Sequence, residues 1–152
     1  MATVYLGVGS NVGDREAHIQ KAVALLRDHE HMQVTAVSAL IETEPVGGVP
    51  QGKFLNGAIR IQTDLMPNDL LAALKNVERR CGRNKSESNM PRTLDLDILL
   101  YDDVVIVEGK TLSIPHPRMA ERSFVLGPLA EIAPEAVHPR LQKTVRELLE
   151  GN

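Results

Sequence analysis

The stretch MPRTLDLDILLYDD, residues 90–103, combines the pattern of a buried strand with an unusual pair of charges. Successive side chains of a β-strand point to opposite faces, so Leu96 and Ile98 share one face and Asp95 and Asp97 share the other. A buried carboxylate is costly unless it is paired or bound to a metal. The pattern therefore predicts a strand with one face in the core and the other in a polar site.

Around this strand the chain contains the remaining elements of an α+β fold. Apolar and β-branched runs predict further strands at residues 3–9, 32–43 and 54–64. Two stretches with helical spacing separate them, one following Asp14 and one beginning near Pro67. The order strand, helix, strand, strand, helix, strand predicts a ferredoxin-like arrangement, with a mainly antiparallel sheet, packed helices and C-terminal additions.

Individual residues predict where the helices begin and end. Asp14 is a typical N-cap, and Pro67 suits the first turn of a helix. Gly82 follows the second helix as a natural stop. Near the C-terminus, Thr144 and Glu147 have the spacing of a capping box and predict one more short helix.

Composition restricts the class of protein. A chain of 152 residues, 43% hydrophobic and 24% charged, is typical of one globular domain, which we expect to span residues 1–152. The net charge of -3 argues against a broad nucleic-acid-binding face. Only two phenylalanines, two tyrosines and no tryptophan are present, too few for an extended base-stacking surface.

Cellular location is predicted from three absences in the sequence. Cys81 is the only cysteine, so the chain has no disulfide framework. The N-terminus has no basic segment ahead of an apolar stretch, unlike a signal peptide. No apolar run approaches the roughly 20 residues of a membrane span. We expect a cytoplasmic protein that acts as a monomer.

The paired aspartates point to a divalent cation. Two carboxylates about 7 Å apart along one strand repel each other, and a cation beside them removes that repulsion. Mg²⁺ typically takes one or two carboxylates and completes its shell with waters and phosphates. Arg83, Lys85 and Arg92 lie nearby in sequence and could offset phosphate charge. The alternative is a strand with a solvated polar face beside a loop whose cations serve solubility.

A second polar cluster lies in IPHPRMAERSFVL, residues 114–126. It brings His116, Arg118 and Arg122 within seven residues, followed by Phe124. A histidine in such company can donate a hydrogen bond to a phosphate without acting as a base. Phe124 and Phe54 are either core residues or contacts to a flat heterocycle.

Other nucleotide-binding motifs are absent. The chain has no phosphate-binding loop of the G-x-x-x-x-G-K-[ST] type. GVGSNVG, residues 7–13, has its third glycine one place late for a dinucleotide fingerprint, and Glu30 is the only candidate ribose partner. Two alternatives remain open: a Mg²⁺-dependent nucleotidyl- or glycosyltransferase that uses D-x-D, and a non-catalytic ferredoxin-like domain that binds a small ligand.

At PRTLDLDILLY the sequence closely resembles the 6-hydroxymethyl-7,8-dihydropterin pyrophosphokinase family of folate biosynthesis. Other matching segments follow in order: GSN after the first strand, TEP and FLN between residues 43 and 56, PHPRMAERSF and PLAEIAPE. The resemblance implies an enzyme that transfers pyrophosphate from ATP to 6-hydroxymethyl-7,8-dihydropterin and releases AMP.

The resemblance also implies roles for individual residues. Asp95 and Asp97 would hold two Mg²⁺ ions, and Arg83 and Arg92 would act near the phosphates of ATP. The other residues expected on the ATP side are Glu78, Ile98, Ser113, His116 and Arg122. The residues expected to bind the pterin are Thr43, Glu44, Val46, Phe54, Asn56 and Phe124.

The sequence departs from the family pattern in three places. Asn89 and Met90 stand where the family often has a tryptophan-glycine pair, in a loop expected to close over the pterin. Pro117 replaces a frequent tyrosine, and an arginine near position 110 is replaced by Lys110 or Thr111. We expect loops 47–53 and 83–92 to flank the site and to exclude water during the reaction.

Overall fold

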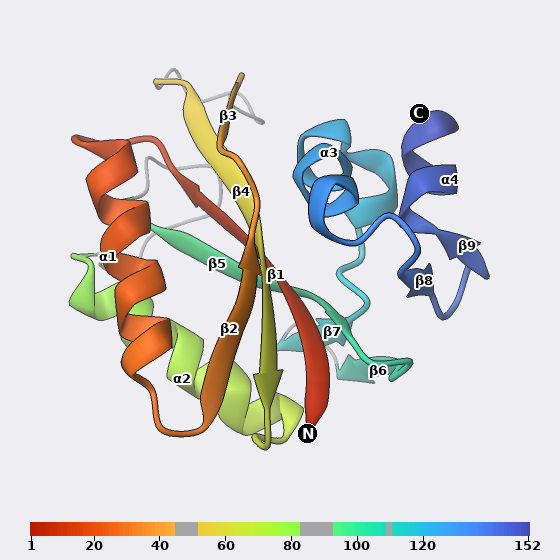
Figure 1. Ribbon diagram of the computed structural model, residues 1–152, viewed down its shortest axis with the longest axis horizontal. Coiled ribbons are helices and arrows are strands. Elements are labelled where there is room, and N and C mark those ends of the chain that lie inside the picture. The colour runs from red at the N-terminus through yellow and green to blue at the C-terminus, as the bar shows by residue number, and fades with distance from the viewer. Residues whose placement is uncertain (45–51, 83–92, 109–110) are drawn as a thin grey trace.

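The protein is described here by a computed structural model, which describes residues 1–44, 52–82, 93–108 and 111–152 (Figure 1). Its elements, in chain order, are β1 (Ala2–Ser10), α1 (Arg15–Asp28), β2 (Met32–Val37), β3 (Ile41–Thr43), β4 (Phe54–Thr63), α2 (Pro67–Arg80), β5 (Asp95–Tyr101), β6 (Ile106–Glu108), β7 (Leu112–Ile114), the 3₁₀ turn η1 (Met119–Glu121), α3 (Ser123–Ile132), β8 (Val137–His138), β9 (Lys143–Thr144) and α4 (Val145–Glu150).

The central sheet is antiparallel, with the strand order β2-β4-β1-β5. The short strand β3 pairs with the first residues of β4, so β2 and β3 lie along the same side of that strand. Helix α1 connects β1 to β2, and α2 connects β4 to β5. This is the predicted ferredoxin-like arrangement, and its C-terminal additions are η1, α3, α4 and two small hairpins.

Helices α1 and α2 cover one face of the sheet (Figure 1). Asp14 caps α1 by accepting a hydrogen bond from the backbone N–H of Ala17 at 3.1 Å, and α2 ends before Gly82, whose φ is +92°. The predicted stops and starts of both helices are therefore confirmed. Their buried apolar side chains are Ile19, Ala22, Leu26, Leu70, Leu74 and Val77.

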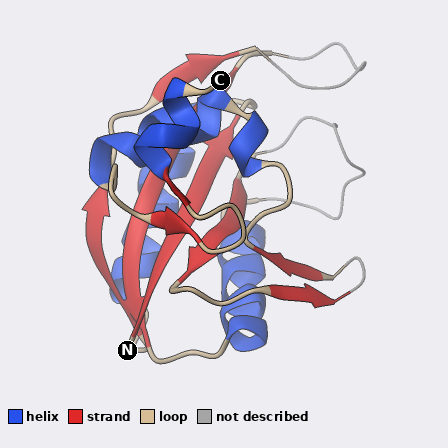
Figure 2. Ribbon diagram, turned by 90° about the vertical axis from the view of Figure 1, so that its right-hand side faces the viewer, coloured by secondary structure: helices blue, strands red, loops and turns tan. Residues whose placement is uncertain are grey.

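A second core lies on the opposite face of the sheet, where α3 and α4 pack (Figure 2). Ala58 of β4 and Leu99 of β5 contribute to this core, together with Leu126 and Leu129 of α3. Leu99 is the extra residue of a register shift, because Leu6 pairs with Ile98 while Tyr5 pairs with Leu100. The α4 capping box between Thr144 and Glu147 is present as predicted.

One predicted strand is wrong in its extent. Residues 32–43 form two strands, and the break begins at Ser38. The Ser38 N–H donates to the Ala58 carbonyl at 2.9 Å, and the Ser38 hydroxyl accepts from the Ala58 N–H at 2.8 Å. The serine side chain thus replaces a backbone acceptor of the ladder, which separates β2 from β3.

Several predictions fall on residues that the structure does not describe. The two loops expected to flank the site, 47–53 and 83–92, lie mostly or entirely within the undescribed residues 45–51 and 83–92. Among the described residues, no helix is long and apolar enough to cross a membrane.

Candidate active site

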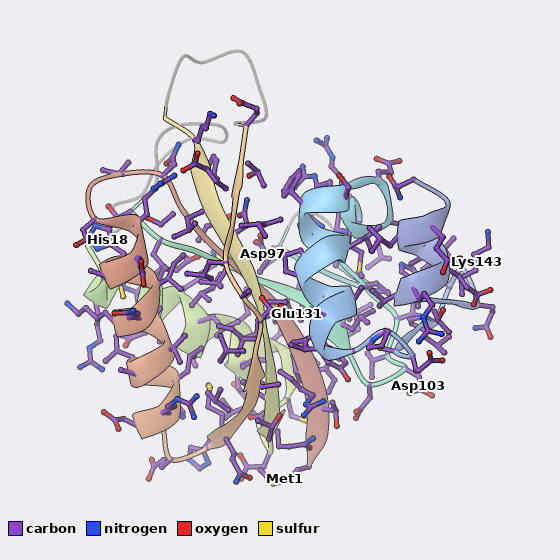
Figure 3. All side chains as sticks on the ribbon, turned by 45° about the horizontal axis from the view of Figure 1, so that its top comes forward. Met1, His18, Asp97, Asp103, Glu131 and Lys143 are labelled. Carbon is purple, nitrogen blue, oxygen red and sulfur yellow. The ribbon has the colours of Figure 1, made fainter. Side chains whose placement is uncertain are left out.

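The two aspartates of β5 lie on the sheet face that carries α3. Leu96 and Ile98 are each 5% exposed and belong to the core beneath α1 and α2, whereas Asp95 and Asp97 are half-buried on the other face. Figure 3 shows Asp97 between the sheet and the α3 layer. The alternation predicted from the sequence is confirmed.

Two glycines of β1 lie directly opposite these carboxylates. Gly9 pairs with Asp95, and Gly7 pairs with Asp97. A Cβ atom at Gly9 would lie 2.6 Å from Oδ1 of Asn56, closer than side chains tolerate. Glycine at these two alternate positions leaves the floor beside the aspartates free of side chains. The sequence interpretation missed this role, although the spacing of the glycines in GVG was a signal for it.

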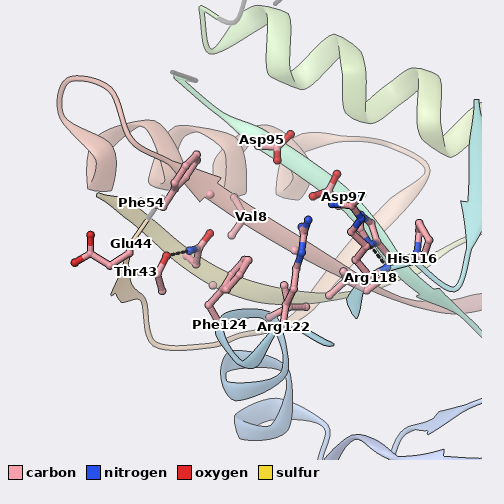
Figure 4. Close-up of a pocket in the computed structure, with 17 residues that line it drawn as sticks. Val8, Thr43, Glu44, Phe54, Asp95, Asp97, His116, Arg118, Arg122 and Phe124 are labelled. Atoms are coloured by element: carbon pink, nitrogen blue, oxygen red, sulfur yellow. Dashed lines mark hydrogen bonds between the residues drawn. The ribbon is translucent and has the colours of Figure 1, made fainter. Parts of the chain in front are cut away.

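The aspartates and glycines form part of a cleft with a volume of about 410 Å³ (Figure 4). β1, β3, β4 and β5 supply one side of the cleft, and the segment from β7 to α3 supplies the other. The predicted site residues among its lining are Thr43, Glu44, Phe54, Asn56, Asp95, Asp97, His116, Arg122 and Phe124.

One end of the cleft is aromatic and rich in amide and hydroxyl groups. Phe54 of β4 and Phe124 of α3 project into it from opposite sides (Figure 4). Asn56 and Thr43 also line the cleft, and the Asn56 amide donates to the Thr43 hydroxyl at 2.5 Å. An Asn held in this way keeps its carbonyl oxygen in a fixed direction. This end suits a flat ring with hydrogen-bonding groups along one edge.

The other end of the cleft is cationic. His116, Arg118 and Arg122 line it, and Figure 4 shows His116 and Arg118 on the side of Asp97 away from Phe54, with Arg122 between Phe124 and Asp97. The Arg122 guanidinium lies 5.6 Å from the centre of the Phe124 ring, a cation–π contact that orients both side chains. This end suits a polyanion such as a chain of phosphates.

The protonation of His116 follows from its contacts. Nδ1 accepts a hydrogen bond from the Arg118 backbone N–H at 3.2 Å, which leaves the proton of the neutral ring on Nε2. Burial lowers the pKa of His116, and the positive charge of Arg122 lowers it further, partly offset by Asp95. The ring is therefore a neutral donor at physiological pH.

Comparisons with known proteins agree with this geometry. The model of the 7,8-dihydro-6-hydroxymethylpterin-pyrophosphokinase (HPPK) family matches residues 5–134. The chain belongs to this family. Among curated HPPK proteins, one from Aquifex aeolicus is 43% identical over 152 residues, covering 100% of this chain and 93% of its own length. One from Bacillus subtilis is 50% identical over 128 residues, covering 84% of this chain and 76% of its own length.

Solved structures show the HPPK fold at lower identity. A Plasmodium falciparum HPPK-DHPS chain with pteroate aligns with 99% of this chain at a TM-score of 0.80 and 17% identity. This chain spans 42% of that solved chain, so the likeness concerns its fold over the HPPK portion.

Not every residue predicted from the HPPK resemblance lines the cleft. Ile98 is buried in the core under the helices, and Ser113 lies half-buried on β7. Glu78 is 6% exposed on α2, and its Oε2 accepts a hydrogen bond from the Leu96 N–H at 2.8 Å. This bond fixes the strand backbone between Asp95 and Asp97. The roles of these residues toward ATP stay predictions.

Three further predicted residues, Arg83, Arg92 and Val46, lie outside the described part of the chain. Conversely, the predicted set omitted Arg118, which lines the cleft beside His116. Its position in PHPR, two residues after the histidine, was the available signal.

The described lining is well suited to positioning and charge stabilisation. Two carboxylates lie beside a ring-binding end and a cationic end, which meet where Arg122 contacts the Phe124 ring. His116 already uses Nδ1 for a backbone hydrogen bond, so that nitrogen is not free to accept a proton from a substrate. The arrangement favours a transfer between two bound substrates over nucleophilic attack by a side chain.

Proposed function

We propose that this HPPK chain transfers the pyrophosphoryl group of ATP to 6-hydroxymethyl-7,8-dihydropterin at this cleft, giving AMP and the pterin diphosphate for folate biosynthesis. The observation that carries the proposal is the order of groups along the cleft. Phe54 and Phe124 define a ring site, Asp95 and Asp97 lie beside it, and the cations begin with Arg122 at the Phe124 ring and continue to Arg118 and His116.

In this proposal the pterin stacks between the two phenylalanine rings. The Asn56 side chain, held by Thr43, presents its carbonyl oxygen to donors on the pterin edge. Stacking fixes the plane of the ring, and the amide fixes its rotation within that plane. The hydroxymethyl group can then be held toward Asp95 and Asp97.

Asp95 and Asp97 are proposed to hold two Mg²⁺ ions together with ATP. The donor set fits, because two half-buried carboxylates in an open cleft offer the few oxygen ligands that Mg²⁺ takes from protein. Among the described residues, no larger group of His, Cys, Asp and Glu side chains forms a complete metal site. When bound, Mg²⁺ favours deprotonation of an oxygen ligand and offsets negative charge on phosphate.

The cationic end is proposed to bind the phosphates. His116 donates from Nε2, and Arg122 supplies a guanidinium that Phe124 keeps in place. Fixed donors stabilise the charge that builds on the transferred group without reorganising during the reaction. Arg83 and Arg92 are proposed to add charge from the neighbouring loop. The transfer occurs in line between the two substrates, with no covalent intermediate on the enzyme.

We also propose that the protein works as a monomer in the cytoplasm. The monomer is supported by the described lining, which one chain supplies without a partner.

The deciding experiment follows the nucleotide products. Purified protein is incubated with Mg²⁺, ATP and 6-hydroxymethyl-7,8-dihydropterin, and the nucleotides are resolved by chromatography. The proposal predicts AMP in step with pterin diphosphate. ADP would indicate transfer of a single phosphoryl group, and an absence of turnover would contradict the assignment.

A further inference from the structure

Arg15, the first residue of α1, joins two strands that bear the ring-binding end of the cleft. One guanidinium nitrogen, Nη2, donates to Oε2 of Glu42 on β3 at 2.8 Å. The other, Nη1, donates to the backbone carbonyl of Lys53, immediately before β4, at 3.0 Å. Figure 1 shows the start of α1 at the same end of the sheet as β3.

These contacts lie directly behind two residues of the cleft. Thr43 and Phe54 are partners in the β3–β4 ladder and both line the cleft. Glu42 precedes Thr43, and Lys53 precedes Phe54. Arg15 therefore forms a hydrogen bond to the residue next to each member of the Thr43–Phe54 pair. Because side chains alternate along a strand, Glu42 points to the helix side of the sheet while Thr43 points into the cleft.

Other contacts extend this attachment. Nζ of Lys53 lies 3.8 Å from Oε1 of Glu42 and 3.5 Å from Oε1 of Glu44. The Asn11 amide, in the segment between β1 and α1, donates to the Gly52 carbonyl at 3.2 Å. The hydrogen bond from Arg15, reinforced by its charge, lowers the pKa of Glu42, so the carboxylate is charged at neutral pH.

The attachment matters because β3 is short. It has three residues and, in the described part of the chain, pairs with β4 alone. Thr43 and Phe54 form its last pair of the ladder, where backbone pairing is weakest because strand ends open first. If this pair opens, the Asn56–Thr43 hydrogen bond and the placement of the Phe54 ring change together.

We propose that Arg15 is a positioning residue for the heterocyclic substrate, which holds Thr43 and Phe54 in their binding arrangement from the opposite face of the sheet. The inference rests on the proposed function, since it assigns the heterocycle to this end of the cleft. Arg15 does not line the cleft, so its contribution is preorganisation of the residues that do.

Arg15→Met tests the proposal by separating the two substrates. We expect the KM for the pterin to rise about tenfold, the effect of losing one charge-assisted hydrogen bond, with the KM for ATP unchanged. A direct titration of pterin, with Mg²⁺ and a nonhydrolysable ATP analogue at saturation, should weaken by the same factor. Arg15→Lys, which cannot form both bonds of the fork, should be intermediate.

The matched control is Arg27→Met, on the exposed last turn of the same helix, which should leave both KM values unchanged. A loss of helix stability would not explain a rise in the pterin KM, because removing a positive charge from the first turn of α1 favours the helix. Thermal unfolding of Arg15→Met should therefore stay close to wild type.

A double-mutant cycle tests whether Arg15 acts through its hydrogen bond to Glu42. Glu42→Gln should weaken pterin binding, and the combination with Arg15→Met should lose less than the product of the two single effects. An unchanged pterin KM in Arg15→Met, or equal losses for pterin and ATP, would overturn the proposal. Failure of the proposed function is distinct, because the wild-type protein would then form no pterin-dependent AMP.

Discussion

At the scale of single residues, the site depends most on the two half-buried carboxylates of β5. We expect Asp97→Ala to lose at least about 10²-fold in rate, as when one preorganised electrostatic group is removed from a site. Steady-state formation of AMP measures this loss. Asp97→Asn, which keeps the shape and removes the charge, should lose nearly as much.

The control for the charge is Asp103→Asn, an exposed aspartate in the turn after β5. Its turnover should match wild type. Near-wild-type turnover in both Asp97 variants would contradict a role for that carboxylate in metal binding.

His116 gives a second prediction, which concerns a single proton. Because Nδ1 accepts a backbone hydrogen bond, the donor toward the phosphates is Nε2–H. Glutamine can place an amide N–H near the Nε2 position, whereas asparagine reaches only the Nδ1 position. His116→Gln should therefore retain about tenfold more activity than His116→Asn, the effect of one hydrogen bond to a charged group.

The pH dependence of the rate provides the check on this assignment. Burial, and next the charge of Arg122, lower the pKa of His116 below its usual 6.5, so the ring stays neutral above that pH. Between about pH 6.5 and 8 the rate profiles of wild type and His116→Gln should be parallel. A profile in which only wild type loses activity as pH rises through this range would mean that the charged ring is required.

At the scale of elements, the C-terminal hairpin places a histidine in the protein interior. His138 of β8 is 6% exposed, and its Nδ1 accepts from the backbone N–H of Arg140 at 3.3 Å and Leu141 at 3.2 Å. Burial lowers the pKa of His138, assisted by the positive charge of Arg140. The neutral form is therefore the one that the folded protein contains.

This lowered pKa links stability to pH. Below pH 6.5 the unfolded chain binds a proton at this histidine more readily than the folded chain does. The free energy of unfolding therefore decreases as the pH is lowered from the unfolded pKa toward the folded pKa. His138→Asn keeps an acceptor for the two N–H groups without titrating, and it should flatten this dependence. Urea unfolding at about pH 8 and pH 5.5 measures the change.

The same experiment on His116→Gln measures the contribution of His116, a half-buried histidine whose lowered pKa changes stability with pH in the same direction. An equal slope in wild type and His138→Asn would show that His138 does not resist protonation in the folded state.

Local patterns predicted some elements better than others. The alternation in LDLDI predicted which face of β5 is buried. Side chains alternate along a strand, so once the leucines face the core the aspartates must lie on the opposite face. The division of residues 32–43 could not be predicted, because it depends on Ser38 meeting Ala58, a residue 20 positions away. The floor formed by Gly7 and Gly9 likewise becomes evident only when β1 is paired with β5.

At the scale of the whole molecule, the cleft exists because a second layer packs on only part of the sheet. The β5 aspartates and the cations after β7 approach each other through tertiary packing of α3, which carries Phe124 and follows Arg122. The sequence predicted both groups of residues and, through the family resemblance, their common site. The position of α3 depends on the second core, whose residues have no distinctive periodicity.

The three strands β1, β4 and β5 contribute side chains to both cores. Neighbouring residues illustrate this: Ile98 faces the first core and Leu99 the second, while Ala58 and Ile59 divide in the same way on β4. Because one backbone supports both cores, we predict that the described layers unfold as one cooperative unit, as expected for a single domain over residues 1–152.

Cys81, the only cysteine, reports on the first core from the end of α2. It is 4% exposed, and burial raises the pKa of its thiol, so it should react with a thiol reagent mainly when the protein opens.

Leu129→Ala removes a fully buried side chain from the second core, at a cost of about 2–5 kcal/mol. If unfolding is cooperative, labelling of Cys81 in the distant core should accelerate accordingly. Leu141→Ala, at a position 47% exposed, should leave the labelling rate unchanged. A Leu129→Ala protein that loses helical signal at lower urea while Cys81 stays protected would instead mean that α3 and α4 open separately, and that the cationic wall of the cleft can detach from the sheet that holds the aspartates.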